Sequence, residues 1–359
     1  MGTTRQFRMK TPESILIIKL SAIGDVVHTL PFLDVLRKNF PHARIDWLVE
    51  EQASQIIAGH PDLDRTIVSQ RKSWKRRLLN GKTCMPVIRE VKVFLKELRT
   101  YEYDLVIDLQ GLLKSGVLVG LSRGKRKIGM DGAREGGWIF LNERSVPVDY
   151  DQHAIDRYLR VAGYLECDFS SWKGDIPVSE SDKKWVNNLL NAKGNNKRPL
   201  VAINPMARWK TKLWESERFA VLADRITDEL SCKVIFTGSS MDRNVIEDIS
   251  KKMKVQPMNL AGRTGLKQLA YLFTKCAALL TTDTGPMHIG AAMGCRVVAL
   301  FGPTAPWRTG PYGHSHKVIR TDLECSPCFK KKCKDIHCMK DITVDRVFEA
   351  VKNMVIERS

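Results

Sequence analysis

Apolar positions along the chain follow two alternating spacings. Short, nearly continuous apolar runs are separated by longer stretches in which apolar residues recur every three or four positions. The runs in the first half of the chain predict strands at 14–20, 44–49, 65–69, 103–109 and 126–130, and the stretches between them predict helices at 26–39, 52–59, 86–99 and 112–121. Apolar strands that alternate with amphipathic helices are typical of parallel βαβ units with both sheet faces covered. The first half therefore predicts an α/β domain.

The second half of the chain repeats this arrangement after a polar stretch. Its expected strands are 200–204, 233–237, 278–282 and 296–301, and its expected helices are 215–230, 241–253, 265–276 and 285–293. We therefore predict an α/β protein of two Rossmann-like, doubly wound parallel-sheet domains that face a central cleft, where ligands of such sheets bind. The expected parts are an N-terminal domain over 1–170, a linker over 171–199, a second domain over 200–342, and a terminal helix over 343–359 that could pack back on the N-terminal domain.

Positive charge is concentrated in one segment. The 359 residues include 58 Lys or Arg and 40 Asp or Glu, a net charge of +18, and residues 65–127 alone hold 16 basic against 5 acidic residues. Such a segment favours an anionic partner: nucleic acid, an anionic membrane surface or a phosphorylated substrate. No apolar run approaches the ~20 residues of a membrane-spanning helix, and the first residues lack the apolar segment of a secretory signal. We therefore expect a cytoplasmic protein.

The first loop with candidate chemistry is 19–28, which leaves the first expected strand and opens a helix. Gly24 permits a tight turn, and Asp25 follows at the helix start. An aspartate in this position most often caps the helix. Alternatively, Ser21 provides the cap and Asp25 is a general base. The loop carries no G-x-G-x-x-G dinucleotide fingerprint.

A second loop, with the sequence Asp-Thr-Gly-Pro-Met-His, ends an expected strand of the second half. Pro286 suits a first helical turn, where its missing N–H is not needed. Thr284 and Gly285 would present a hydroxyl and backbone N–H groups to a phosphate. Asp283 precedes them, and His288 could add a donor. The alternative is a capped helix with a buried histidine.

Two further loops of the second half place charge after a strand. Arg208, Trp209 and Lys212 set cations beside an indole. They form either a solvated basic loop or a clamp on a diphosphate, with Lys212 as its point charge. Asp242, in the loop after 233–237, could bind a ribose or cap its helix.

Four of the nine cysteines form a cluster: Cys325, Cys328, Cys333 and Cys338. Their spacing, C-x2-C-x4-C-x4-C, fits either an all-thiolate zinc site or reduced thiols that pack a short loop. A zinc ion there would be structural, because four thiolates leave no open coordination position. Several of the other cysteines lie in apolar contexts and are expected in the core.

Several motifs together resemble the heptosyltransferases of lipopolysaccharide core synthesis, glycosyltransferase family 9, which have GT-B architecture. The motifs are KLSAIGDVVHTLP (19–31), IDWLVEE (45–51), YDLVIDLQGLLKS (103–115), KLWE (212–215) and DTGPMHIGAAMG (283–294). Two further motifs, RKSWKRR (71–77) and GMDGARE (129–135), look most like the family's enzymes that add the first heptose to the Kdo inner core. The resemblance implies an inverting enzyme that transfers heptose from ADP-heptose to Kdo-lipid A and requires no cofactor.

The resemblance also implies roles for individual residues. Asp25 would be the general base that deprotonates the acceptor hydroxyl. Lys212 and the helix start at Thr284 and Gly285 would meet the charge of the departing diphosphate. The other candidates for donor binding are Asp242, Asp283, Pro286 and His288, and the acceptor-binding positions correspond to Lys72, Lys75, Arg76 and Arg134. An acceptor that carries carboxylates and phosphates in an anionic membrane would explain the basic segment, and implies a peripheral location on the cytoplasmic face of the inner membrane.

Two other functions stay open on the sequence. One is a related sugar-nucleotide enzyme with the same architecture but another donor or acceptor, which a different nucleotide preference would mark. Arg208 and Trp209 depart from the family pattern, which leaves the diphosphate contacts beyond Lys212 open, and the cysteine cluster is not universal in the family. The other is a nucleic-acid-binding protein that uses the basic segment and a zinc module. Few aromatic residues are interleaved with the basic ones, and the strand-end loops would have no purpose. No nucleic-acid partner is therefore expected.

Overall fold

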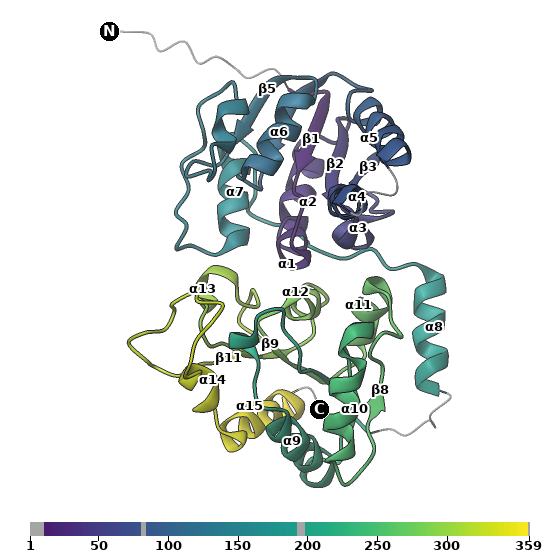
Figure 1. The fold of residues 1–359 in the computed structure, drawn as a ribbon, viewed down its shortest axis with the longest axis vertical. Coiled ribbons are helices and arrows are strands. Elements are labelled where there is room, and N and C mark those ends of the chain that lie inside the picture. The colour runs from purple at the N-terminus through teal and green to yellow at the C-terminus, as the bar shows by residue number, and fades with distance from the viewer. Residues whose placement is uncertain (1–10, 80–83, 192–197, 358–359) are drawn as a thin grey trace. The chain divides into compact units, whose positions relative to one another are not determined.

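The computed structural model describes residues 11–79, 84–191 and 198–357. The chain forms two compact units (Figure 1). The first contains the described residues up to Ser21 together with Thr29–Asp149 and Asp156–Lys173, and the second contains Ala22–His28, Tyr150–Ile155 and the chain from Gly174 onward. The second unit therefore includes a short segment from near the start of the chain, which the expected boundary at residue 170 does not anticipate.

The first unit is built on five parallel strands in the order β3-β2-β1-β4-β5. They are β1 (Ser14–Ile18), β2 (Arg44–Glu50), β3 (Arg65–Ser69), β4 (Tyr103–Asp108) and β5 (Gly124–Gly129), which confirms the five expected strands. In the register of the sheet, Ile15 of β1 pairs with Ile45 of β2 and with Leu105 of β4. The strand order changes direction between β1 and β4, the place where ligands of such sheets bind.

One hydrophobic cluster joins four elements to the same face of this sheet. Trp74, Phe94, Leu118 and Phe140 pack with Leu16 of β1. These side chains come from α4 (Arg71–Leu79), α5 (Cys84–Leu98), α6 (Leu113–Leu121) and the 3-10 helix η1 (Gly137–Phe140). The other helices are α2 (Leu30–Asn39), α3 (Glu51–Ile57) and α7 (Ala154–Tyr164). The four elements α4, α5, α6 and η1 therefore form one layer over the sheet.

The second unit is built on six parallel strands in the order β11-β10-β9-β6-β7-β8. They are β6 (Leu200–Asn204), β7 (Lys233–Phe236), β8 (Met258–Asn259), β9 (Ala278–Thr282), β10 (Val297–Leu300) and β11 (Lys317–Ile319). The four expected strands are confirmed. The sequence pattern missed β8 and β11, because strands of two and three residues offer too few positions for an apolar run to stand out.

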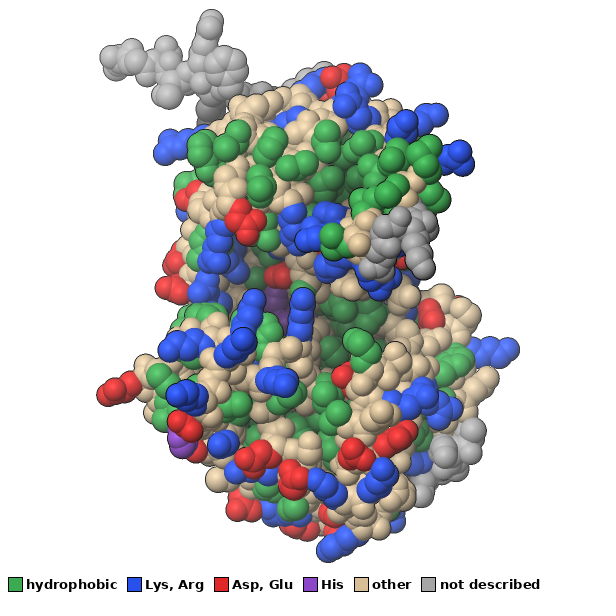
Figure 2. All heavy atoms as spheres, viewed as in Figure 1, with side chains coloured by type: hydrophobic (Ala, Val, Ile, Leu, Met, Phe, Trp, Pro, Cys, Tyr) green, Lys and Arg blue, Asp and Glu red, His purple; other side chains and the backbone are tan. Residues whose placement is uncertain are grey.

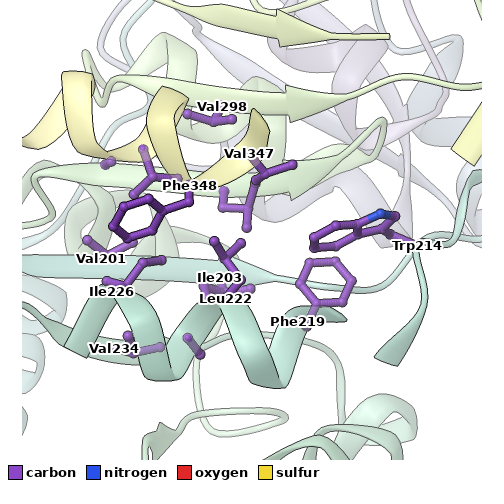
Figure 3. Close-up of a cluster of buried hydrophobic side chains, with 14 of the residues drawn as sticks. Val201, Ile203, Trp214, Phe219, Leu222, Ile226, Val234, Val298, Val347 and Phe348 are labelled. Carbon is purple, nitrogen blue, oxygen red and sulfur yellow. The ribbon is translucent and has the colours of Figure 1, made fainter. Parts of the chain in front are cut away.

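The helices of the second unit range in length from three to fourteen residues. They are α1 (Ile23–Val27), α8 (Glu180–Asn191), η2 (Lys210–Lys212), α9 (Ser216–Glu229), η3 (Ser240–Asp242), α10 (Arg243–Lys251), α11 (Leu266–Thr274), α12 (Gly285–Ala292), α13 (Pro306–Thr309), α14 (His337–Lys340) and α15 (Val344–Ile356). Ile203 of β6, Phe219 of α9 and Phe348 of α15 meet in one buried cluster (Figure 3). This cluster is the core on one face of the sheet.

The terminal helix α15 packs on the second unit. Val347 and Phe348 are buried in its core, and the Trp214 Nε1–H donates to the Ile342 carbonyl oxygen at 3.0 Å. The interpretation that residues 343–359 pack back on the N-terminal domain is corrected accordingly. The apolar face of α15 packs against α9, β9 and β10 of the second unit.

Two other expectations differ from the structure. Residues 171–199, expected as a linker, contain α8, which packs on α11 and buries Val186. Residues 26–39, expected as one helix, form the end of α1 and all of α2. Pro31, near the start of α2, lacks the N–H that one continuous helix would need there.

Candidate active site

The N-terminal ends of α1 and α12 lie side by side within the second unit. A Cβ placed on Gly24 of α1 would lie 2.2 Å from Cδ2 of His288, and a Cβ on Gly285 of α12 would lie 3.3 Å from Cγ2 of Ile23. Real Cβ contacts are essentially never as short as the first of these distances. The glycine at position 24 is therefore required by the close approach of α1 to α12.

Asp25 is the third residue of α1 and not its cap. The N-cap residue is Ala22, and its backbone N–H donates to Oδ2 of Asp25 at 2.8 Å. The alternative in which Ser21 caps the helix is also wrong, because Ala22 occupies the N-cap position and, among the described residues, no side chain caps α1. The Ser21 hydroxyl instead accepts a hydrogen bond from Lys114 Nζ at 2.9 Å. The half-buried carboxylate of Asp25 is thus held at a helix N-terminus, where negative charge is stabilised.

Three histidine rings lie edge to face near this carboxylate. The ring centroid of His28 lies 4.3 Å from that of His288 and 4.9 Å from that of His153. Burial lowers the pKa of His288 to about 4, although the negative charges of Asp283 and Asp25 oppose this shift. His288 is therefore neutral near pH 7. Its Nδ1 atom is buried and has no hydrogen-bond partner among the residues that the structure describes.

Lys212 and Asp283 form an ion pair in which the carboxylate is buried and the lysine is half-buried. The Lys212 Nζ lies 2.5 Å from Oδ2 of Asp283, which also accepts a hydrogen bond of 2.6 Å from the Thr304 hydroxyl. The same ammonium group lies 4.6 Å from the centre of the Trp209 ring. Lys212 is thus held by the Asp283 carboxylate and the Trp209 indole. The sequence predicts only a contact between Lys212 and a diphosphate. Arg208 of the same loop is exposed.

The start of α12 is accessible, as the sequence predicts. Thr284 is its N-cap residue, and the Thr284 side chain makes no capping hydrogen bond. Thr284, Gly285 and Pro286 are half-buried, between the buried residues Asp283 and Met287. A helix N-terminus with backbone N–H groups and a partial positive charge is suited to an anion such as a phosphate. His288, one turn further along, is buried as in the alternative interpretation.

Asp242 is the last residue of the 3-10 turn η3, whose N-cap residue is Ser239. By position Asp242 is also the N-cap residue of α10, but its side chain makes no capping hydrogen bond to that helix. Its Oδ2 accepts hydrogen bonds from the backbone N–H and the hydroxyl of Ser239, both at 2.7 Å. The capping alternative is therefore right in the position of Asp242, but its carboxylate makes no hydrogen bond to α10. A role of Asp242 in ribose binding stays a prediction, with one of its two carboxylate oxygens engaged by Ser239.

A cationic pocket lies at the end of β2 in the first unit. Glu50 is buried there, and its carboxylate lies 2.8 Å from Arg71, 2.8 Å from Lys72 and 3.8 Å from Lys114. Burial acts to raise the pKa of Glu50, but hydrogen bonds from Lys72 and Arg71 hold this pKa below its usual range. Next to Glu50 is a pocket of about 240 Å³ whose lining includes Gln52, Ser73 and the predicted acceptor residues Lys72 and Arg76. The buried Glu50 carboxylate thus holds the cationic groups of Arg71, Lys72 and Lys114 together at the end of β2.

The other two predicted acceptor residues are exposed. Lys75 lies on α4, one position before Arg76. Arg134 lies in the loop before η1, and its backbone N–H donates to the Gly111 carbonyl oxygen at 2.9 Å. This hydrogen bond joins the loop that carries Arg134 to the loop that follows β4. Sequence reasoning did not single out Glu50 or the histidines at 28 and 153. The position of His28, three residues after Asp25 on one helix, is a signal that could have found it.

The four clustered cysteines are reduced and line one pocket. Cys325, Cys328, Cys333 and Cys338 all border a cavity of about 350 Å³. Burial and the other three thiols raise the pKa of the Cys338 thiol. Within the described part of the chain, no three His, Cys, Asp or Glu side chains are grouped so that they could hold a metal ion. The thiols as placed do not form a zinc site, and zinc binding stays a prediction.

The expected core cysteines are confirmed. The buried thiols are Cys167, Cys232, Cys276 and Cys295, whereas Cys84 is exposed. None of the described helices has both the length and the apolar content that crossing a membrane would need.

The sequence of this chain is similar to those of known proteins. A family model described as glycosyltransferase family 9 (heptosyltransferase) matches residues 91–338. Lipopolysaccharide heptosyltransferase 1 of Pseudomonas aeruginosa is 31% identical over 326 residues, which cover 89% of this chain and 87% of that protein. The lipopolysaccharide core heptosyltransferase OpsX of Haemophilus influenzae is 27% identical over 86% of this chain and 85% of its own length.

A solved structure has the same fold. The heptosyltransferase WaaC of Escherichia coli with ADP superimposes with a TM-score of 0.75 at 26% identity, over 96% of this chain and 100% of that one. WaaC has also been solved with ADP-2-deoxy-2-fluoro heptose, at 25% identity to this chain and a TM-score of 0.73, over the same shares of the two chains.

Proposed function

The chain belongs to glycosyltransferase family 9, the heptosyltransferases, and we propose that it transfers a heptose from ADP-heptose to the Kdo inner core of lipopolysaccharide. The observation that carries this proposal lies within the second unit. There, α1 places Asp25 beside the start of α12, and the ion pair of Lys212 and Asp283 immediately precedes that helix. A carboxylate thus lies beside groups that attract an anion.

Asp25 is the general base of the proposed reaction. Its carboxylate accepts the proton of the acceptor hydroxyl while that oxygen attacks the anomeric carbon of the heptose. The bond between the anomeric carbon and the diphosphate oxygen breaks, ADP leaves, and the configuration at the anomeric carbon inverts. The hydrogen bond from the Ala22 N–H holds the carboxylate in place.

The start of α12 and Lys212 stabilise the negative charge that develops on the departing diphosphate. Backbone N–H groups near Thr284 and Gly285 bind one phosphate, and the ammonium group of Lys212 provides a positive charge. Asp283 keeps that ammonium group oriented in the absence of donor. The proposal assigns no part of this work to a divalent cation. Transfer should therefore continue in the presence of EDTA.

The acceptor binds in the first unit in this proposal. Its carboxylates and phosphates would be bound by Lys72, Lys75, Arg76 and Arg134. The pocket beside Glu50 supports this assignment, because it combines Lys72 and Arg76 with room for part of a sugar. A lipid-linked acceptor places the protein at the cytoplasmic face of the inner membrane.

A transfer assay tests the proposal. Purified protein is mixed with ADP-heptose and Kdo-lipid A in the presence of EDTA, and the acceptor is analysed by mass spectrometry. The expected result is a gain of one heptose. If the folded protein transfers nothing, a different donor or acceptor is indicated, and stabilisation of the protein by a series of nucleoside diphosphates then identifies the nucleotide.

A further inference from the structure

The outer surface of one helical layer in the first unit has no partner within the described residues of that unit. The layer consists of α4, α5, α6 and η1, whose inner sides share one core with the sheet. Of the twelve large hydrophobic side chains that are exposed among the described residues of this unit, nine belong to the layer. They are Leu78, Leu79, Met85, Ile88, Val93, Leu113, Val117, Trp138 and Ile139. We call this surface the apolar-basic face. Figure 2 shows hydrophobic side chains spread over α5 and α6.

Helix α5 has two apolar sides. Its inner side buries Val87, Phe94 and Leu98. Its outer side carries Met85, Ile88 and Val93 in exposed positions, and Val93 is 67% exposed. A surface helix that needs only one apolar stripe to pack on a sheet does not require the second one. The outer stripe therefore indicates a surface that binds something else.

Basic side chains are interleaved with the outer stripe of α5. Arg89, Lys92 and Lys96 are exposed at helical spacing from its apolar residues. Helix α4 adds exposed Lys75 and Arg76. Helices α4 and α5 together carry eight Lys or Arg residues and two acidic residues, Glu90 and Glu97, and the Glu90 carboxylate is paired with Arg77 at 2.7 Å. The apolar-basic face is thus both hydrophobic and strongly positive.

The combination fits an anionic lipid bilayer better than a protein or a nucleic acid. Protein interfaces are depleted of lysine, whereas helices at bilayer surfaces pair apolar side chains with Lys and Arg. Long basic side chains bury their apolar stems at an interface and keep the charge at the headgroups. Nucleic acid would leave the aliphatic side chains of α5 in water. Charge complementarity therefore favours anionic phospholipid.

We propose that the apolar-basic face docks on an anionic membrane leaflet. Met85, Ile88, Val93 and the exposed Trp138 enter the headgroup boundary, and the surrounding Lys and Arg pair with lipid phosphates. The proposal rests on the proposed function for its biological setting, since a lipid-linked acceptor lies in such a leaflet. The binding itself is a property of the surface and can be measured without any transfer.

Vesicle binding of the full chain tests this surface. Wild-type protein is sedimented with vesicles of phosphatidylethanolamine and phosphatidylglycerol, and with vesicles of phosphatidylcholine alone. The test variant combines Met85→Ser, Ile88→Ser and Val93→Ser. The matched control combines Val221→Ser, Met241→Ser and Val255→Ser, which are also exposed apolar residues but lie in the second unit. Circular dichroism confirms that both variants fold.

The wild type should bind the anionic vesicles at least tenfold more strongly than the neutral ones, and added salt should weaken this binding. The test variant should lose tenfold or more of the binding, and the control should not. Equal binding of the test variant and the wild type would overturn the proposal, as would a wild type that ignores anionic vesicles. A wild-type dimer that only the test variant dissociates would assign the face to a second copy of the chain.

The transfer assay separates this proposal from the proposed function. With a Kdo acceptor that lacks lipid, the test variant should transfer heptose at the wild-type rate. A wild type that binds vesicles but transfers no heptose would refute the proposed function and leave the docking surface standing. A wild type that transfers heptose but does not bind vesicles would refute the docking surface alone.

Discussion

Gly24 and His288 touch so closely that a Cβ at position 24 would lie 2.2 Å from the ring of His288. Because the ring is buried, it cannot move aside into solvent. The contact fixes α1, and with it the Asp25 carboxylate, at the start of α12. The distance between the proposed base and the proposed phosphate site thus depends on a glycine.

Substitution Gly24→Ala should displace α1 from α12. We expect the free energy of unfolding to fall by about 1–3 kcal/mol, the usual cost of overpacking. Heptose transfer should fall on the order of 100-fold, since small shifts of a catalytic group have effects of that size. Denaturant unfolding and initial transfer rates measure the two effects. The double variant with His288→Ala should recover part of the lost stability. A Gly24→Ala protein with wild-type rate and stability would contradict the close contact.

Asp25→Asn should remove the base and keep the fold. The amide oxygen can still accept the hydrogen bond from the Ala22 N–H, so α1 keeps its capping contact. General base catalysis typically contributes 10²–10⁴-fold, and we expect a loss of transfer in that range, with Asp25→Ala at least as impaired. Affinity for ADP, measured by calorimetry, should change by less than about threefold, below ~0.7 kcal/mol. Transfer by Asp25→Asn at more than a tenth of the wild-type rate would exclude Asp25 as the base.

Removal of the Lys212 side chain should affect both binding and turnover of the donor. Lys212→Ala leaves the buried Asp283 carboxylate without its cation, and breaking one partner of a buried pair costs about 3–5 kcal/mol. We expect a lower melting temperature, a higher KM for the donor and a lower kcat. Lys210→Ala, an exposed neighbour in the same basic loop, is the matched control and should behave as wild type. If both variants have the same kinetics, Lys212 has no part in meeting the charge of the diphosphate.

His288 should make the protein less stable in mild acid. Its pKa is about 4 in the folded protein and near 6.5 in the unfolded chain. Between these values the unfolded chain binds the proton and the folded protein does not. Stability is therefore lost as the pH falls below 6.5, by about 2 kcal/mol at pH 5. Denaturant titrations from pH 7 to pH 5 measure the slope, which should be reduced in His288→Gln. Identical slopes for the variant and the wild type would show that the ring is not buried in a neutral form.

Much of the fold could be predicted because its strands are buried on both faces. Runs such as 14–20 and 200–204 are apolar at nearly every position, and no solvated loop needs such a sequence. Helix α4 could not be predicted in this way. It buries only Trp74 among a run of cations, so that its apolar stripe is a single residue. The polar sequence of α8 obscured that helix for the same reason.

The parts of the candidate site that one short sequence motif encodes could be predicted. The start of α12 combines its proline, glycine and threonine within a few residues, and the structure leaves it accessible. The charge partners of Glu50 come from α4 and α6, and the ring that meets His28 at 4.9 Å lies at residue 153. Such contacts depend on how distant segments pack, which local patterns do not report. The ion pair of Lys212 and Asp283 is another contact between distant segments that a local pattern does not predict.

The acceptor pocket of the first unit gives the last prediction. Lys72 and Arg76 line the pocket beside the buried Glu50, and Lys75 is exposed on the same helix. An acceptor with carboxylates and phosphates would bind these three cations by charge. Changing all three to Gln should raise the KM for the acceptor at least tenfold at low salt, or about 1.4 kcal/mol, and leave the KM for ADP-heptose unchanged. The effect should shrink as salt is added, because exposed charges are screened.

A matched control separates a local effect from a change in net charge. Lys251, Lys252 and Lys254 are exposed cations of the second unit, and their triple change to Gln removes the same number of charges. This control should keep the wild-type KM for the acceptor. If both triple variants raise that KM equally, the positive charge of the whole protein attracts the acceptor and the pocket does not. If neither raises it, the acceptor binds at another surface, and Arg134 becomes the next residue to change.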